Sequence, residues 1–165
     1  MKKLIFALLF VSTSVYAQDD SFDRLVKQKK YAEALKIVCH KFPINCKKVK
    51  IKKPGELEEA YAVTANYTNS ISLSESAFEY NGRPHEGWLA AIIGHENIHQ
   101  EQSMYVRQVA GVQIRFLSNY YWEALLEYEA WAHMYIHSKR YQLSPDMLDE
   151  IKYNMDDFQS MIDKQ

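Results

Sequence analysis

The chain is poor in several residue types that mark specialised classes of protein. It has only two cysteines among 165 residues, so it is not a small scaffold held together by many disulfides. Five glycines and four prolines exclude a collagen-like or low-complexity chain. A formal net charge of −1 supplies no bulk positive charge to hold nucleic acid. With 47% hydrophobic and 13% aromatic residues, the chain can bury a core, and its length suits one domain.

The N-terminal segment has the features of a signal peptide for export. Two lysines follow the initiating methionine, an apolar run occupies 4–11, and small residues precede a cleavage position after Ala17. The apolar run is shorter than the roughly 20 residues that a membrane span needs. We therefore predict a signal peptide at 1–17 and a mature chain from Gln18, with a formal charge of −3 and no membrane span. The expected location is the bacterial periplasm or the medium.

Export also bears on the two cysteines. Cys39 and Cys46 are seven positions apart, with Pro43 between them. In an oxidising compartment such a pair can close a small disulfide loop. Spacing does not establish bridge geometry, so two free thiols are the alternative.

Residue patterns predict an α+β layout within a single domain at 18–165. Segment 21–42 is typical of two short helices that are broken near Lys29 and Lys30. Segment 47–53 is typical of an edge strand whose lysines discourage pairing with another chain. Segment 56–65 fits either a helix or a strand, whereas 71–78 alternates as a strand does.

Three helices are predicted in the second half of the chain. The first spans about 84–108, with Pro84 in its first turn and Gly111 as the break after it. The second spans roughly 117–139. The third follows the Ser-Pro-Asp signal at 144–146 and runs to about 162.

The most informative segment is His-Glu-Asn-Ile-His at 95–99, an HExxH motif inside the first of these helices. His95 and His99 lie one turn apart on the same helix face, so their imidazoles can converge on one zinc ion. Glu96 lies one residue further round the helix. There it is expected to serve as general base for the water that zinc activates, rather than as a ligand.

A catalytic zinc needs three protein ligands and one open position. The helix that follows carries Glu123, Glu127 and Glu129 among aromatic residues, and a carboxylate is costly to bury unless it is paired or coordinating. Glu123 and Glu127 share one helix face, whereas Glu129 points elsewhere, alongside His133. Each of these four residues is a candidate for the third ligand.

The combination of HExxH with a later glutamate helix resembles the gluzincin metallopeptidases, the thermolysin-like group. The nearest pattern is Glu-x-x-Ala-Asp, found in the CAAX prenyl-protease family and its soluble relatives. Glu127 and Ala130 match its first and fourth positions, but Trp131 stands where that pattern has an Asp that supports a zinc-binding His. Gln102 matches an HExxHxxQ variant of some small bacterial zincins. The resemblance spans about 71–137 and implies Glu127 as the third ligand.

The resemblance also implies a minimal zincin-like domain. Its parts are a small antiparallel or mixed sheet packed on the HExxH helix, a downstream glutamate helix and a C-terminal helix. Segment 18–45 is then an N-terminal helical segment, and 46–165 is the metallopeptidase core. Strand 71–78 is expected at the sheet edge, where it pairs with an extended peptide. The candidates for stabilising the oxyanion are Tyr120, Tyr121, His133, His137 and Arg115.

The expected function is an exported zinc-dependent metallopeptidase that hydrolyses peptide or protein substrates, with Glu96 as general base. Two alternatives stay open. One is a zincin-like protein without catalysis, which uses the fold for binding or structure. The other is a zinc amidase that acts on cell-wall peptides.

Overall fold

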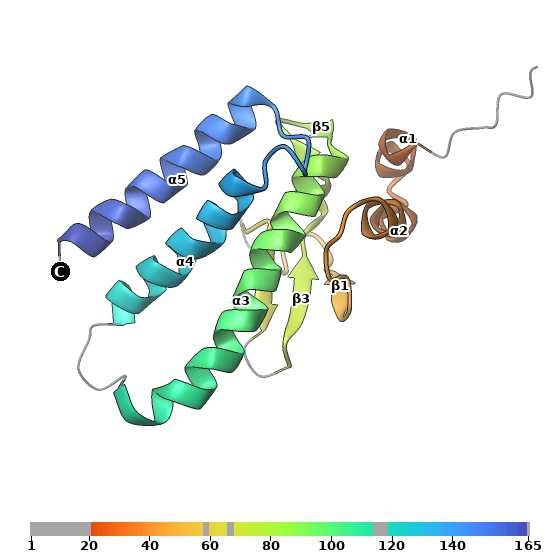
Figure 1. The fold of residues 1–165 in the computed structure, drawn as a ribbon. Coiled ribbons are helices and arrows are strands. Elements are labelled where there is room, and N and C mark those ends of the chain that lie inside the picture. The colour runs from red at the N-terminus through yellow and green to blue at the C-terminus, as the bar shows by residue number, and fades with distance from the viewer. Residues whose placement is uncertain (1–20, 58–59, 66–67, 114–118, 165) are drawn as a thin grey trace, which may run out of the picture.

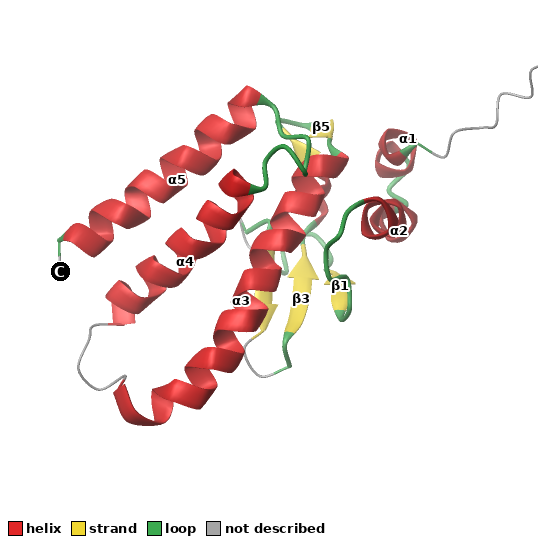
Figure 2. Cartoon of the chain, viewed as in Figure 1, coloured by secondary structure: helices red, strands yellow, loops and turns green. Residues whose placement is uncertain are grey.

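The computed structural model describes residues 21–57, 60–65, 68–113 and 119–164, and the side chains of 103–120 lie outside this description. The predicted signal peptide, 1–17, also lies outside the described residues. Helices and a small amount of strand form an α+β fold, as predicted (Figures 1 and 2). The elements in chain order are α1 (Phe22–Lys27), α2 (Tyr31–Lys41), β1 (Val49–Ile51), β2 (Ala62–Ala65), β3 (Ser70–Leu73), the 3₁₀ turn η1 (Glu75–Phe78), β4 (Glu79–Tyr80), β5 (Arg83–Pro84), α3 (Glu86–Gln113), α4 (Asn119–Ile136) and α5 (Pro145–Asp163).

Helix α3 is the central element of the fold. One of its faces contacts β2 and β3, another contacts α4, and α4 in turn packs against α5 (Figure 1). The N-terminal half of α3 is almost entirely buried, with Trp88, Leu89 and Ile93 fully covered. Burial of large apolar side chains on this scale is the main favourable term that holds a domain together. Whatever α3 carries in its middle is therefore held on a rigid support.

The three-stranded sheet has the order β1–β3–β2, with β1 parallel and β2 antiparallel to β3. The lysine-rich segment forms the edge strand β1, as predicted, and the ambiguous segment 56–65 supplies the other edge, β2. The prediction that 71–78 lies at the edge was wrong. Ile71 and Leu73 of β3 are fully buried, because the central strand is covered by α3 and paired on both sides.

The predicted strand 71–78 is also too long. β3 ends at Leu73, and the chain turns through η1 before it forms β4. Ala77 and Phe78 are both fully buried. In a continuous strand these adjacent side chains would point to opposite faces, whereas a 3₁₀ turn brings both into one core.

The helix boundaries agree with prediction to within about three residues except at α3; α4, for example, ends at Ile136 and not near 139. Pro84 pairs with Glu79 in the β4–β5 ribbon, and α3 begins at Glu86, where His85 Nδ1 accepts a hydrogen bond of 3.0 Å from the Trp88 N–H. Gly111 does not break the helix, which continues to Gln113. A glycine costs a helix about 1 kcal/mol, which weakens it without ending it. Among the described residues, no helix combines the length and apolar character needed to cross a membrane.

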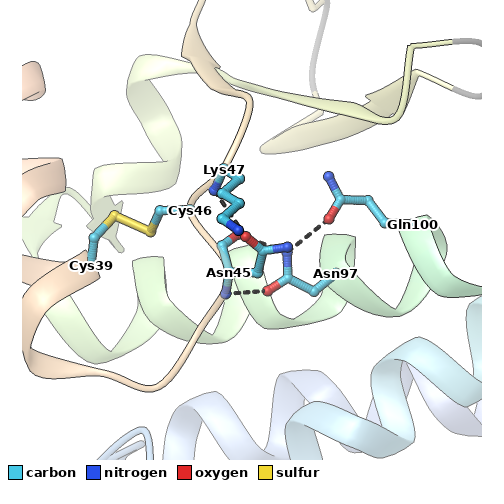
Figure 3. The surroundings of a disulfide bond; sticks show 6 residues. All are labelled: Cys39, Asn45, Cys46, Lys47, Asn97 and Gln100. Carbon is cyan, nitrogen blue, oxygen red and sulfur yellow. Dashed lines mark hydrogen bonds between the residues drawn. A yellow bond between two sulfur atoms is a disulfide. The ribbon is translucent and has the colours of Figure 1, made fainter.

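The cysteines form a disulfide, which is one of the two possibilities that their spacing left open. Cys39 in α2 is bonded to Cys46, and their Cα atoms are 5.9 Å apart. The loop that the disulfide closes is attached to α3: the Asn45 N–H donates to Asn97 Oδ1 at 2.9 Å, and Asn97 Nδ2 donates to the Asn45 carbonyl at 3.0 Å (Figure 3). Asn97 also donates to Gln100 Oε1 at 3.2 Å. The disulfide thus holds a loop that braces the HExxH segment of α3.

Replacement of both cysteines, Cys39→Ser with Cys46→Ser, should lower the free energy of unfolding by about 2–3 kcal/mol, because the unfolded chain loses a loop constraint. We expect the melting temperature to fall by roughly 5–10 °C in thermal denaturation followed by circular dichroism. A reductant should lower the wild-type melting temperature to the same value and leave the double variant unchanged. Equal melting temperatures for wild type and variant would contradict this role.

Candidate metal centre

The HExxH histidines project from the middle of α3 toward α4. His95 and His99 are one turn apart, and their Nε2 atoms lie 3.0 Å from each other. His95 is 8% exposed, so its ring is taken almost completely out of water. Two imidazole nitrogens this close must share a proton or a cation, because their lone pairs would otherwise face each other in a buried place.

The third donor comes from α4. Glu127 places one carboxylate oxygen 3.4 Å from His95 Nε2 and the other 3.2 Å from His99 Nε2. Within the described residues, His95, His99 and Glu127 form the one group of three whose donor atoms all lie close enough to hold a metal ion. The candidates Glu123, Glu129 and His133 are outside this group.

The donor separations fit a zinc ion. Four ligands at 2.0–2.1 Å around tetrahedral zinc are about 3.3 Å from one another. The two Nε2 atoms are 3.0 Å apart, and each is 3.2–3.4 Å from one of the two Glu127 carboxylate oxygens, so the contacts lie near that value. With one atom taken from each residue, the three donors lie within 4.8 Å of one another. Two imidazole nitrogens and one carboxylate oxygen are also a donor set used at catalytic zinc sites, where the fourth position stays open.

Electrostatics keep Glu127 in a state that suits a cation, and the same negative charge acts on His99. Burial would raise the pKa of Glu127, but hydrogen bonds and charge interactions with His95 and His99 outweigh burial and lower it to about 2. Burial would lower the pKa of His99, yet the hydrogen bond and negative charge of Glu127 and the charge of Glu96 raise it instead. Glu127 is therefore ionised at neutral pH and offers a carboxylate.

Glu96 is directed toward the sheet rather than toward α4. It is 6% exposed, and the Thr64 hydroxyl in β2 donates to its Oε2 at 2.6 Å. Because Thr64 holds one carboxylate oxygen, the other is left without a described partner. Thr64 was missed by sequence reasoning, since no motif surrounds it and only the strand pairing brings it beside α3.

The two imidazoles have different neighbours: Gln102 contacts His99, and Trp131 contacts His95. Gln102 Oε1 lies 2.8 Å from His99 Nδ1. His95 Nδ1, in contrast, is buried without a hydrogen-bond partner among the described residues, and the Trp131 ring packs edge-on against it with centroids 4.9 Å apart. Where the related pattern has an Asp, this chain therefore has an aromatic contact.

The described candidates for oxyanion stabilisation lie outside the group of three donors, although the charges of His133 and His95 interact. His133 packs against His137, with ring centroids 4.4 Å apart, and lines a cavity of about 360 Å³ with Arg140 and Tyr141. None of the three donor residues lines that cavity. The pKa of His133 is lowered, mainly by burial and further by the positive charges of His137, His95 and Arg140. Tyr121 packs against Trp122. The remaining two candidates, Arg115 and the Tyr120 side chain, lie outside the described residues.

A glycine beside the motif allows a close contact with the turn after α4. Tyr141 is 2% exposed and lies against Gly94, so that a Cβ atom added there would be 2.4 Å from the Tyr141 hydroxyl and 3.1 Å from Cζ. Tyr141 therefore packs the end of α4 onto α3 one residue before His95. A larger side chain at position 94 would require Tyr141 to shift.

Comparison with protein-family models, with curated proteins and with solved structures finds no significant match to this chain. The functional interpretation therefore depends on the motif and on the geometry of the site.

Replacement of Glu127 by alanine should weaken zinc binding by more than the roughly 10–100-fold that loss of a supporting hydrogen bond causes, because a direct donor is removed. Zinc affinity measured by competition with a chelator checks this. The matched control is Glu123→Ala, an exposed carboxylate one turn away on the same helix, which should keep its zinc. Unchanged affinity in Glu127→Ala would remove Glu127 from the site.

Gly94→Ala should lower the free energy of unfolding by about 1–3 kcal/mol, because the new methyl group overlaps Tyr141. Chemical denaturation gives the size of the loss. Adding Tyr141→Phe removes the nearest atom, so the double variant should be more stable than Gly94→Ala alone. If Tyr141→Phe destabilises both backgrounds equally, the two residues do not interact as described.

Proposed function

We propose that this chain is a zinc hydrolase of the zincin class. The observation that carries the proposal is the convergence of two helix-borne imidazoles and one carboxylate at separations suited to tetrahedral zinc. Within that class, the His95, His99 and Glu127 set is the gluzincin arrangement, and we assign the protein as a metallopeptidase of that type. When bound, zinc would lower the pKa of a water molecule and polarise a substrate carbonyl.

Glu96 is the proposed general base. Its carboxylate adjoins His95 in the chain, and its charge acts on His99, so it lies beside the donors without joining them. The hydrogen bond from Thr64 fixes the rotation of the carboxylate and occupies Oε2. Oε1 then accepts a proton from the attacking water and returns it to the leaving amine.

The substrate is proposed to be an extended peptide that lies along β2. This strand pairs with β3 on one side, and among the described residues nothing pairs with its other side. Thr64 belongs to β2, so a peptide added to this edge would run past Glu96. Main-chain pairing of this kind tolerates many sequences. β2 therefore takes the role first expected of 71–78.

We further propose that the protein is exported. The disulfide between Cys39 and Cys46 supports it, because such bonds persist in oxidising compartments and are rare in the cytosol.

One observation favours the alternative of a zincin-like binding protein. Among the described oxyanion candidates, His133 and His137 pack against each other and Tyr121 packs against Trp122, and no described side-chain hydrogen bond fixes any of them as an oxyanion donor. A site without such a donor would hold zinc and bind peptide but hydrolyse it slowly.

Glu96→Gln separates these functions. The variant keeps all three donors, so it should bind zinc as the wild type does and lose hydrolysis by about 10²–10⁴-fold. Cleavage of an unstructured protein followed by mass spectrometry measures activity, and metal analysis of the same sample measures zinc. The matched control is Glu101→Gln, an exposed change of the same kind on α3. Zinc-loaded wild type that cleaves no better than Glu96→Gln would favour the binding protein.

A further inference from the structure

The side chain of Gln102 connects the two helices that carry the candidate metal donors. It is 8% exposed and extends from α3 toward α4. Its Oε1 lies 2.8 Å from His99 Nδ1. Its Nε2 donates to the Leu126 carbonyl at 3.0 Å and to Glu129 Oε2 at 2.9 Å. One amide thus contacts a donor histidine, the residue before Glu127, and a second carboxylate.

The hydrogen-bond partners determine which way this amide faces. The two acceptors on α4, the Leu126 carbonyl and the Glu129 carboxylate, each take one of the two hydrogens on Gln102 Nε2. The opposite orientation would place the amide oxygen against a carbonyl and a carboxylate, which are acceptors only. Oε1 must therefore face His99, and because Oε1 only accepts, His99 Nδ1 must carry the proton. In the neutral ring the lone pair of His99 is then at Nε2, the atom directed toward His95 and Glu127.

We propose that Gln102 is the positioning residue of the metal centre and that Glu129 acts through it. The negative charge of Glu129 polarises the amide, which makes Oε1 a stronger acceptor and the His99 ring a better zinc donor. The bond to the Leu126 carbonyl fixes the backbone next to Glu127 at the same time. This inference extends the proposed zinc site. It gives Glu129, first considered as a ligand, a supporting role.

The two donor histidines are therefore unequal. His99 has a partner that sets its tautomer, whereas His95 Nδ1 has none among the described residues and is held by the edge-on contact with Trp131. Among the two donor histidines, only His99 has its tautomer set by a hydrogen bond at Nδ1 from a described residue. Loss of the Gln102 contact should therefore act directly on His99 and reach His95 only through the contact between the two Nε2 atoms.

Gln102→Met tests the direct contact, because methionine has a similar length and cannot serve as the acceptor that the amide provides. We expect zinc affinity, measured by competition with a chelator, to fall about 10–100-fold. Nitrogen-detected NMR of the metal-free protein, at a pH high enough for the His99 ring to be neutral, should show His99 wholly in the Nδ1–H form in the wild type and mixed between tautomers in the variant. A merely structural role for Gln102 would not change that signature.

Glu129→Gln tests the second step on an exposed residue that should not affect folding. Its amide oxygen can still accept from Gln102, but the charge is gone, so we expect a smaller loss of zinc affinity, about three- to tenfold. The matched control is Glu123→Gln, an exposed charge change on the same helix, which should stay within about twofold of wild type. The double variant should bind zinc no more weakly than Gln102→Met alone.

Three results would overturn the inference: an unchanged His99 tautomer in Gln102→Met, equal losses in Glu129→Gln and Glu123→Gln, or additive losses in the double variant. Should Gln102→Met fail to fold, the comparison of Glu129→Gln with Glu123→Gln decides alone. These measurements need zinc and no substrate. A protein that shows the predicted zinc effects but cleaves no peptide would refute the peptidase proposal and leave the role of Gln102 standing. A protein that cleaves peptides but keeps the same His99 tautomer in Gln102→Met would support the peptidase proposal and refute the role of Gln102.

Discussion

The crossing of α3 and α4 brings two imidazole nitrogens and a carboxylate within 4.8 Å of one another, and the rest of the structure depends on this contact. Removing such groups from water is unfavourable unless each finds a partner. In the described structure the partners are the groups themselves, arranged around a point that would suit a cation. Helix α3 must then be straight, rigid and correctly placed, because a shift of one turn would separate the donors.

Several contacts hold α3 in that position, and none of them uses the donor face. The disulfide-closed loop attaches to Asn97 through the backbone of Asn45 (Figure 3). Tyr141 fills the space beside Gly94. Thr64 binds Glu96 from the sheet. Because these contacts reach α3 from different directions, the helix is immobilised while the side of His95 and His99 stays available for α4. Precise placement of this kind is what a metal or catalytic site requires of its scaffold.

The support of the two histidines is asymmetric, and this asymmetry bears on the proposed function. His99 is oriented by a buried amide that also binds α4, so its donor atom is defined before any metal arrives. His95 Nε2 faces His99 and Glu127, but its Nδ1 has no hydrogen-bond partner in the described structure, and Trp131 packs against that ring. Packing constrains a ring plane but does not select a tautomer, because it involves no proton. A zinc site built this way relies on one well-defined imidazole and one adaptable imidazole.

The sequence alone determined the local features of this protein. Helical spacing placed His95 and His99 on one face, turn residues located most helix ends, and the cysteine spacing permitted the disulfide that formed. Such features depend on residues within a few turns of each other, so the 3.6-residue period and turn chemistry suffice to find them. The α+β class followed from the order of the same patterns.

Only the tertiary structure decided which residues meet across elements. Glu123, Glu127 and Glu129 are chemically alike, and the crossing of α3 and α4 brings Glu127 to the histidines and Glu129 to Gln102. Likewise, β3 became the central strand because both neighbours pair with it, which its own alternation cannot reveal. Thr64 reached Glu96 through that pairing. The physical reason is that helix crossing and strand order are set by the packing of distant surfaces, while the periodicity of a segment reports only which of its own faces is apolar.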